Sequence, residues 1–125
     1  MTTPVDQIKT MRQQAEKIFR SALKAVDPIE AVFRYVKVVD GGLQIGERRF
    51  EIKDYDRILV VGAGKAGAPM VKALEDLLGD RISDGDIVVK EGHGLPLQHV
   101  RTHEAGHPVP DERGIRGAED ILSLV

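Results

Sequence analysis

The chain has 125 residues, the size of one ordinary domain and enough for a hydrophobic core. Its composition, 42% hydrophobic and 30% charged, is typical of a globular protein, and a net charge of -2 gives no basis for binding nucleic acid or an anionic membrane. Cysteine is absent, which excludes disulfides, thiolate zinc sites and cysteine nucleophiles. Because the N-terminal segment lacks a continuous apolar stretch, we expect neither signal peptide nor membrane span, and a cytoplasmic protein.

Two leading helices are predicted within residues 1–35. Apolar residues recur every three or four positions over 6–26, which predicts a helix with one apolar stripe. Asp27, Pro28 and Glu30 then supply an N-cap, a first-turn proline and a capping-box glutamate. They predict a second, short helix.

Residues 36–56 are predicted to form a small β hairpin inserted before the core. Asp40 and Gly41 are a hairpin-turn signal, and short apolar runs flank them on both sides.

Residues 57–125 carry a β-α-β pattern. Apolar runs at Ile58–Val61 and Ile87–Val89 predict buried parallel strands, and Ala66–Leu78 between them has helical spacing. A weaker strand is predicted around His99–Glu104, and a last helix from Asp111. This order predicts an α/β fold with a doubly wound, mostly parallel, Rossmann-like sheet.

The last predicted helix runs to Val125 without a capping signal, and only two central strands are convincing, whereas an open sheet has about five or six. We therefore expect the chain to be the front part of a longer protein.

A glycine-rich loop follows the first core strand. Gly62, Gly64 and Gly67 form a G-x-G-x-x-G pattern between a predicted strand and a predicted helix, where backbone N–H groups and the helix dipole can hold phosphate. The alternative is that the glycines only let the helix pack closely on the sheet. Lys65 stands inside this loop, where the positive end of the helix dipole disfavours a lysine by about 0.3–1 kcal/mol unless it meets an anion. A lysine that simply points into solvent is the alternative.

Two well-known nucleotide motifs fit this loop less well. A Walker A loop is excluded because Lys65 is followed by Ala66 rather than serine or threonine, and Leu59 stands where that motif has a glycine. A dinucleotide site would want an acidic residue at the end of the next strand, and Glu91 is near that place but follows Lys90.

The segment "HEAGH" matches a zinc-protease pattern that needs both histidines on one helical face. Gly106 and Pro108 flank His107, and residues before proline avoid the helical region, so we expect neither zinc hydrolysis nor any metal site. We expect instead a strand that leads into a loop, with Asp111 as N-cap of the last helix. Since parallel strands end at one edge, the loops of Lys65, His93 and His107 should meet there, although each histidine alone could be an ordinary loop residue.

The segments "VVGAGKAGAPM", "VVKEGHGLPL", "EAGHPVPDERGIRGAEDIL" and "SALKAVDPIEAV" together resemble the N-terminal part of the glycerate 2-kinase family. These are two-domain enzymes with a MOFRL domain at the far end, and they are often labelled hydroxypyruvate reductase. The resemblance implies that residues 1–125 are the N-terminal part of the Rossmann-like kinase domain. It also implies ATP-dependent phosphorylation of D-glycerate to 2-phosphoglycerate with a divalent cation, which we expect to be magnesium.

The resemblance also implies roles for single residues. Lys65 would hold or polarise the transferred phosphate as the catalytic residue, and it would bind the nucleotide together with Gly62, Gly64 and Gly67. Four further residues would contact substrate or line the cleft: Glu91, His93, His107 and Asp111.

The family's later phosphate loop, its arginine and its C-terminal domain would lie beyond Val125. We therefore expect the missing domain to be this chain's partner, the isolated chain to have little or no activity, and the sheet edge and last helix to expose apolar surface. Two alternatives stay open, an NAD(P)-dependent hydroxypyruvate reductase and an inactive nucleotide-binding fragment. A homo-oligomer also stays open.

Overall fold

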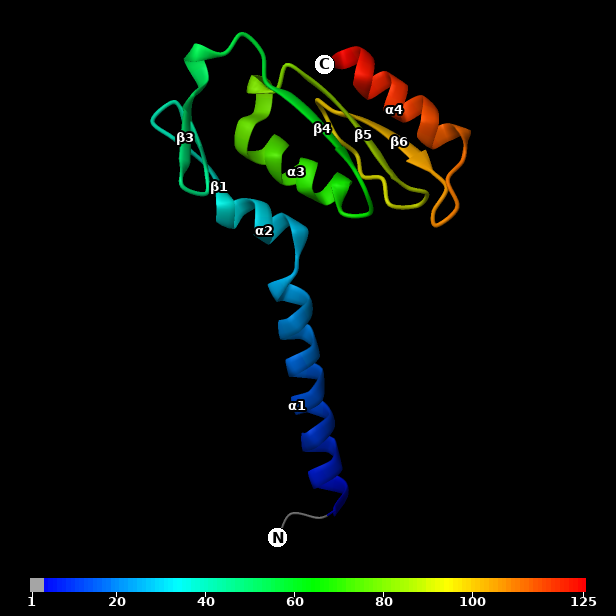
Figure 1. The fold of residues 1–125 in the computed structure, drawn as a ribbon. Helices are drawn as coiled ribbons and strands as arrows, with labels where there is room; N and C mark the ends of the chain where they lie inside the picture. Colours follow the sequence, from blue (N-terminus) through cyan, green and yellow to red (C-terminus); the bar gives the residue numbers. More distant parts are fainter. Residues whose placement is uncertain (1–3) are drawn as a thin grey trace.

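The computed structural model describes residues 4–125 (Figure 1). Its elements in chain order are α1 (Pro4–Ala25), α2 (Pro28–Tyr35), β1 (Val36–Val39), β2 (Gly42–Ile45), β3 (Arg48–Glu51), the 3₁₀ turn η1 (Ile52–Asp54), β4 (Leu59–Ala63), α3 (Gly67–Leu78), the 3₁₀ turn η2 (Gly79–Arg81), β5 (Asp84–Lys90), β6 (Arg101–Ala105) and α4 (Glu112–Leu124).

The two leading helices form as the sequence predicts. Asp27 caps α2, because its Oδ1 accepts hydrogen bonds from the backbone N–H groups of Ile29 at 2.9 Å and Glu30 at 3.1 Å. Helix α1 projects away from the rest of the molecule (Figure 1) and contributes no buried residue. Its apolar stripe is therefore exposed, with Phe19 at 63%. No helix among residues 4–125 is both long and apolar enough to cross a lipid bilayer.

The segment 36–56 forms a three-stranded antiparallel sheet in the order β1-β2-β3, one strand more than the predicted hairpin. The predicted turn is present, with positive φ at Asp40 (49°) and Gly41 (75°). Asp40 is the kind of residue that tolerates this region, and glycine adopts it freely.

The second sheet is parallel, in the order β4-β5-β6, with β5 in the middle. Strand β5 begins three residues before the predicted Ile87, because Asp84 and Asp86 belong to it. Both carboxylates accept hydrogen bonds from Arg101 on the neighbouring strand β6, so these charged residues can lie within the sheet. From the sequence alone they resemble a loop.

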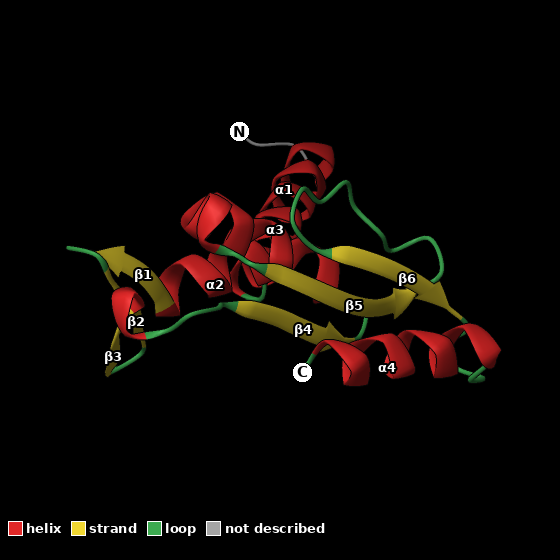
Figure 2. Ribbon diagram, turned by 90° about the horizontal axis from the view of Figure 1, so that it is seen from above, coloured by secondary structure: helices red, strands yellow, loops and turns green. Residues whose placement is uncertain are grey.

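Helices cover both faces of this parallel sheet (Figure 2). A Cβ at Gly67 of α3 would lie 3.2 Å from Val89, whereas a Cβ at Gly117 of α4 would lie 2.5 Å from Val88. Because successive side chains of a strand point to opposite faces, α3 and α4 lie on opposite sides of β5. The buried core between α3 and the sheet consists of Val60, Ala68, Val71, Leu78, Ile82, Ile87, Val89 and Val100.

The predicted exposure of apolar surface on the last helix is confirmed. Ile115 is 60% exposed and Leu122 is 73% exposed on the outer side of α4, and Val61 on the edge strand β4 is 45% exposed.

The parallel sheet and the helices on its two faces confirm the predicted α/β architecture.

Candidate functional site

The carboxyl ends of the three parallel strands meet at one hollow. It is lined by Ala63, Gly64, Lys65, Val88, Val89, Lys90, Ala105, Gly106 and His107. The glycine loop and the His107 loop therefore come together, as the topology predicts, whereas His93, the third residue expected there, is not among the lining residues. Two of the lining side chains are lysines, and none of the lining residues is acidic, so the hollow suits an anion.

The glycine loop presents Lys65 in an exposed turn between β4 and α3. The backbone N–H of Gly64 donates to the carbonyl of Val88 at 2.9 Å, and the N–H of Gly67 donates to the carbonyl of Gly64 at 3.0 Å. No side chain caps the first turn of α3, which leaves its backbone N–H groups available to an anion. Pro69 reduces their number, because proline has no N–H. Fewer free donors remain for an anion than the glycine pattern alone implies, so Lys65 becomes the more important positive group.

The three glycines of the loop have different physical roles. Gly64 has a φ of 119°, which side-chain-bearing residues rarely adopt. A Cβ at Gly62 would lie 3.6 Å from Ile87, and one at Gly67 would lie 3.2 Å from Val89. Gly62 and Gly67 thus face β5, and only Gly64 lines the hollow.

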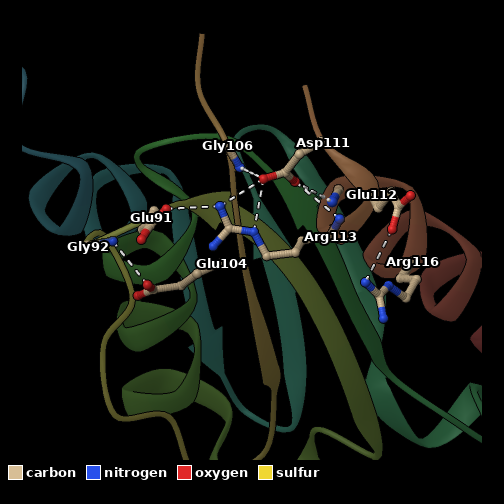
Figure 3. A network of polar contacts seen from close by, with 9 residues as sticks. Glu91, Gly92, Glu104, Gly106, Asp111, Glu112, Arg113 and Arg116 are labelled. Atoms are coloured by element: carbon tan, nitrogen blue, oxygen red, sulfur yellow. Dashed lines mark hydrogen bonds and ion pairs between the residues drawn. The ribbon is translucent and has the colours of Figure 1, made fainter. Parts of the chain in front are cut away.

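The His93 loop, which follows β5, is fastened by a carboxylate that sequence reasoning missed (Figure 3). Glu104 of β6 accepts the backbone N–H groups of Gly92 and Gly94, each at 3.0 Å. These two hydrogen bonds, that from Gly92 first, hold the pKa of Glu104 below its usual value. The signal available in the sequence was a glutamate at the end of the next parallel strand.

Arg113 joins two residues that the sequence places at the cleft (Figure 3). Its guanidinium donates to Asp111 Oδ2 at 2.9 Å and to Glu91 Oε2 at 2.9 Å. Asp111 also caps α4 by accepting the N–H groups of Arg113 and Gly114, and it accepts the N–H of Gly106 at 3.0 Å. The Arg113 hydrogen bond lowers the pKa of Asp111, so its carboxylate stays ionised. Both carboxylates thus support the loops around the hollow and do not line it.

The two histidines of "HEAGH" separate in the structure. His103 lies in strand β6 and faces α4, since a Cβ at Gly117 would lie 3.1 Å from its Cβ. His107 lies in the following loop and lines the hollow. The zinc-protease geometry is therefore absent from this segment, as its flanking glycine and proline predict.

A second hollow lies between the two sheets, lined by Leu43, Ile45, Phe50, Ile52, Tyr55, Arg57, Ile58 and Leu59. Its lining is apolar apart from Arg57 and the Tyr55 hydroxyl. It offers no converging group for catalysis.

Replacing Glu104 with glutamine is expected to loosen the His93 loop, because Gly92 and Gly94 donate to different carboxylate oxygens, and glutamine puts an NH2 donor in place of one of these acceptors. Backbone order parameters of Gly92 and Gly94, measured by NMR relaxation, should fall toward the flexible range below about 0.6. Glu91→Gln is the matched control, because it removes the same charge from the network without touching the loop amides. Equal order parameters in both variants would contradict a fastening role for Glu104.

The chain is similar in sequence to curated proteins and in structure to solved ones. A glycerate 2-kinase of Pyrococcus horikoshii is 39% identical over 115 residues, 92% of this chain and 25% of that protein. A protein of Agrobacterium vitis with a provisional hydroxypyruvate reductase name is 35% identical over 91% of this chain and 23% of its own length. The crystal structure of a Thermotoga maritima glycerate kinase superposes with a TM-score of 0.71 at 33% identity, covering 94% of this chain and 25% of that one.

The chain thus spans about a quarter of the length of the relatives that it matches. These matches confirm the resemblance to glycerate 2-kinases that the sequence motifs indicate. Because a family model matches residues 14–125, which include the glycine loop, the His107 loop and α4, the chain belongs to the family described as a domain of unknown function, DUF4147.

Proposed function

We propose that the protein containing this chain transfers phosphate from ATP to D-glycerate to form 2-phosphoglycerate, and that this chain supplies one wall of the cleft. The observation that carries the proposal is the hollow at the carboxyl edge of the parallel sheet, where Lys65 and Lys90 are the charged lining residues and acidic residues are lacking. Its chemistry suits the phosphates of a nucleotide and the carboxylate of glycerate. The names of the Pyrococcus and Thermotoga relatives support the same reaction.

In this proposal Lys65 is the catalytic residue of the chain. Phosphoryl transfer spreads negative charge over the oxygens of the moving group, and a fixed cation beside backbone donors stabilises that charge. Gly62, Gly64 and Gly67 give the loop the shape that brings Lys65 to the hollow.

His93 and His107 belong to the cleft wall in this proposal, and Arg113 keeps their loops in place through Glu91 and Asp111. A histidine beside bound substrate can donate a hydrogen bond to a carboxylate or phosphate oxygen.

Magnesium is the cation that ATP chemistry would require. It prefers oxygen ligands, carboxylates above all, and no residue that lines the hollow of Lys65 and His107 has a carboxylate. The lining residues therefore do not fit a magnesium site, and we assign no step of the reaction to a cation held by this chain.

The residues at the end of β5 make the hydroxypyruvate reductase alternative weaker. A nicotinamide dinucleotide would need an acidic residue at the end of β5 for its ribose hydroxyls. Strand β5 ends in Lys90, and the carboxylate of Glu91 is held by Arg113 at 2.9 Å.

We propose further that β4-α3-β5 opens a Rossmann-like, doubly wound sheet, which the helices on both faces and the glycine loop support. Residues 1–35, 36–56 and 57–125 would be its leading helices, its β insert and its core. The remaining strands and a C-terminal domain would come from the rest of a cytoplasmic protein, so the isolated chain should have little activity.

The test is an assay of the longer protein for ADP release with ATP and D-glycerate, and in parallel for NAD(P)H oxidation with hydroxypyruvate. We expect glycerate-dependent ADP release and no oxidation of NAD(P)H. Oxidation of NAD(P)H without ADP release would overturn the proposal in favour of the reductase. If the protein is inactive in both assays, an inactive nucleotide-binding protein is favoured instead.

A further inference from the structure

Three potential metal-ligand atoms face one another on the α4 side of the parallel sheet. They come from Asp86 in β5, His103 in β6 and Asp120 in α4, and all lie within 4.8 Å of one another. The closest approaches are those of His103 Nε2 to Asp86 Oδ1 and to Asp120 Oδ2. Asp86 stands four residues before Lys90, about 13 Å along the strand at about 3.3 Å per residue. The cluster is therefore separate from the hollow of Lys65.

Asp86 is the unusual member of the cluster, because its carboxylate is completely buried, with 0% of the side chain exposed. Burying a carboxylate is costly unless both oxygens are compensated. Arg101 Nε donates to Oδ2 at 3.1 Å, but Oδ1 has no hydrogen-bond partner among the described residues. The atom next to this oxygen without a hydrogen bond is Nε2 of His103.

The contact between His103 Nε2 and Asp86 Oδ1 is only 2.6 Å long, yet it lacks hydrogen-bond geometry, and Nε2 is likewise without a hydrogen-bond partner. A hydrogen bond needs the N–H aimed along the line between the two atoms. Two metal ligands instead aim their lone pairs at a third point between them. A close pair that is not aligned for a hydrogen bond is therefore the arrangement expected around a cation.

The distances allow such a cation after a small adjustment. Zinc lies about 2.0–2.2 Å from nitrogen and carboxylate ligands, which places tetrahedral ligand atoms about 3.3 Å apart. His103 Nε2 and Asp120 Oδ2 are 3.5 Å apart, close to that separation. The Nε2–Oδ1 pair would open by several tenths of an ångström, and the side chain of Asp120, 57% exposed, can move to follow it.

Local charge also favours a cation. Asp84, Asp86 and Asp120 carry three negative charges, whereas Arg101, which bonds to the first two, supplies one fixed positive charge. Asp84, Asp86, Asp120 and Arg101 together keep two uncompensated negative charges, and a divalent ion would neutralise them. The neighbouring hollow, lined by Arg101, His103, Asp120, Ser123 and Leu124, gives a water molecule access as a fourth ligand.

We propose that Asp86, His103 and Asp120 bind a divalent metal ion of the zinc class, which fastens α4 to the parallel sheet. One imidazole and two carboxylates are ligands that zinc and similar transition metals accept, and the hard cations prefer all-oxygen sites. The site joins three consecutive elements, β5, β6 and the helix α4 that packs on them, so its role is structural. The proposal is independent of the kinase reaction and replaces the expectation from sequence that the chain holds no metal.

The test is calorimetric titration of chelator-treated protein with Zn²⁺, beside the same titration of Asp120→Asn, His103→Asn and His99→Asn. We expect one bound zinc ion per chain and a higher melting temperature with zinc. Asp120→Asn and His103→Asn should each bind zinc at least about tenfold more weakly. Even the loss of a residue that only hydrogen-bonds to a metal ligand lowers metal affinity by about 10–100-fold. His99, which forms an ion pair with Asp80 at 3.8 Å, lies outside the cluster, and its variant should bind like the wild type.

Asp120→Asn changes an exposed side chain, so it tests the site even if His103→Asn fails to fold. Absence of zinc binding, or binding that is equal in Asp120→Asn and the wild type, would overturn the proposal. In that case direct ion pairing of His103 with Asp86 and Asp120 would account for the cluster.

Discussion

Lys65→Met is expected to lower kcat/KM for glycerate phosphorylation by about 10²–10³-fold in the longer protein, the loss typical when one preorganised donor to a developing negative charge is removed. Lys65 is exposed at the rim of the hollow and is not part of the buried core, so the variant should keep its melting temperature. The measurement is steady-state kinetics with ATP and D-glycerate at a fixed ionic strength.

Lys72→Met is the matched control for this substitution. Lys72 lies in α3, the helix that follows the Lys65 loop, and its replacement removes the same charge. Its ammonium pairs with Asp76 on the helix surface and does not line the hollow. We expect its kcat/KM to stay within about twofold of the wild type, since exposed ion pairs contribute little. Equal losses in both variants would point to a general electrostatic effect and contradict a specific role for Lys65.

Gly64→Ala is expected to lower stability by about 1–3 kcal/mol, the cost of holding a side-chain-bearing residue in a sparsely populated backbone region. The φ of 119° at Gly64 is the reason, because open space around the residue would otherwise accept a methyl group. If the loop relaxes instead, Lys65 moves away from the hollow, and kcat/KM falls while stability is kept. Urea unfolding and kinetics on one preparation distinguish the two results, and either confirms the backbone requirement.

Gly62→Ala gives the control within the same motif. The added methyl would lie 3.6 Å from Ile87, which is ordinary van der Waals contact, and Gly62 has no positive φ. We expect a change in stability within about 0.5 kcal/mol, as for substitutions that touch no special feature. If Gly62→Ala were as damaging as Gly64→Ala, the glycines would serve only to pack α3 on the sheet, which is the simpler explanation of the motif.

Local signals in the sequence were sufficient to predict where the helices α2 and α4 begin. Asp27 and Asp111 predicted the starts of α2 and α4, and both side chains accept backbone N–H groups at those helix starts. Such caps depend on a few neighbouring residues, so they can be inferred without tertiary information. The strand ends were less accurate, since the extent of β5 depends on Arg101, which comes from another strand.

The candidate site was predicted only in outline. The glycine loop and His107 meet at the carboxyl edge of the sheet, because parallel strands end on one side and the sequence order fixes which loops follow them. Glu104, Lys90 and Arg113 were not assigned their roles, since a hydrogen bond such as that from Gly92 to Glu104 joins the loop after β5 to a different strand, β6. No periodicity or spacing reports such a contact.

By itself the sequence determined the order of helices and strands, the parallel α/β class, the glycine loop with its lysine, and the family. These properties follow from local propensity, periodicity and contiguous motifs, each of which is carried by neighbouring residues. Only the tertiary structure decided that Asp111 bonds to the loop of Gly106 and that Asp86 meets His103 and Asp120. Both depend on strand register and on the face that α4 covers, and these are fixed by packing between residues far apart in the chain.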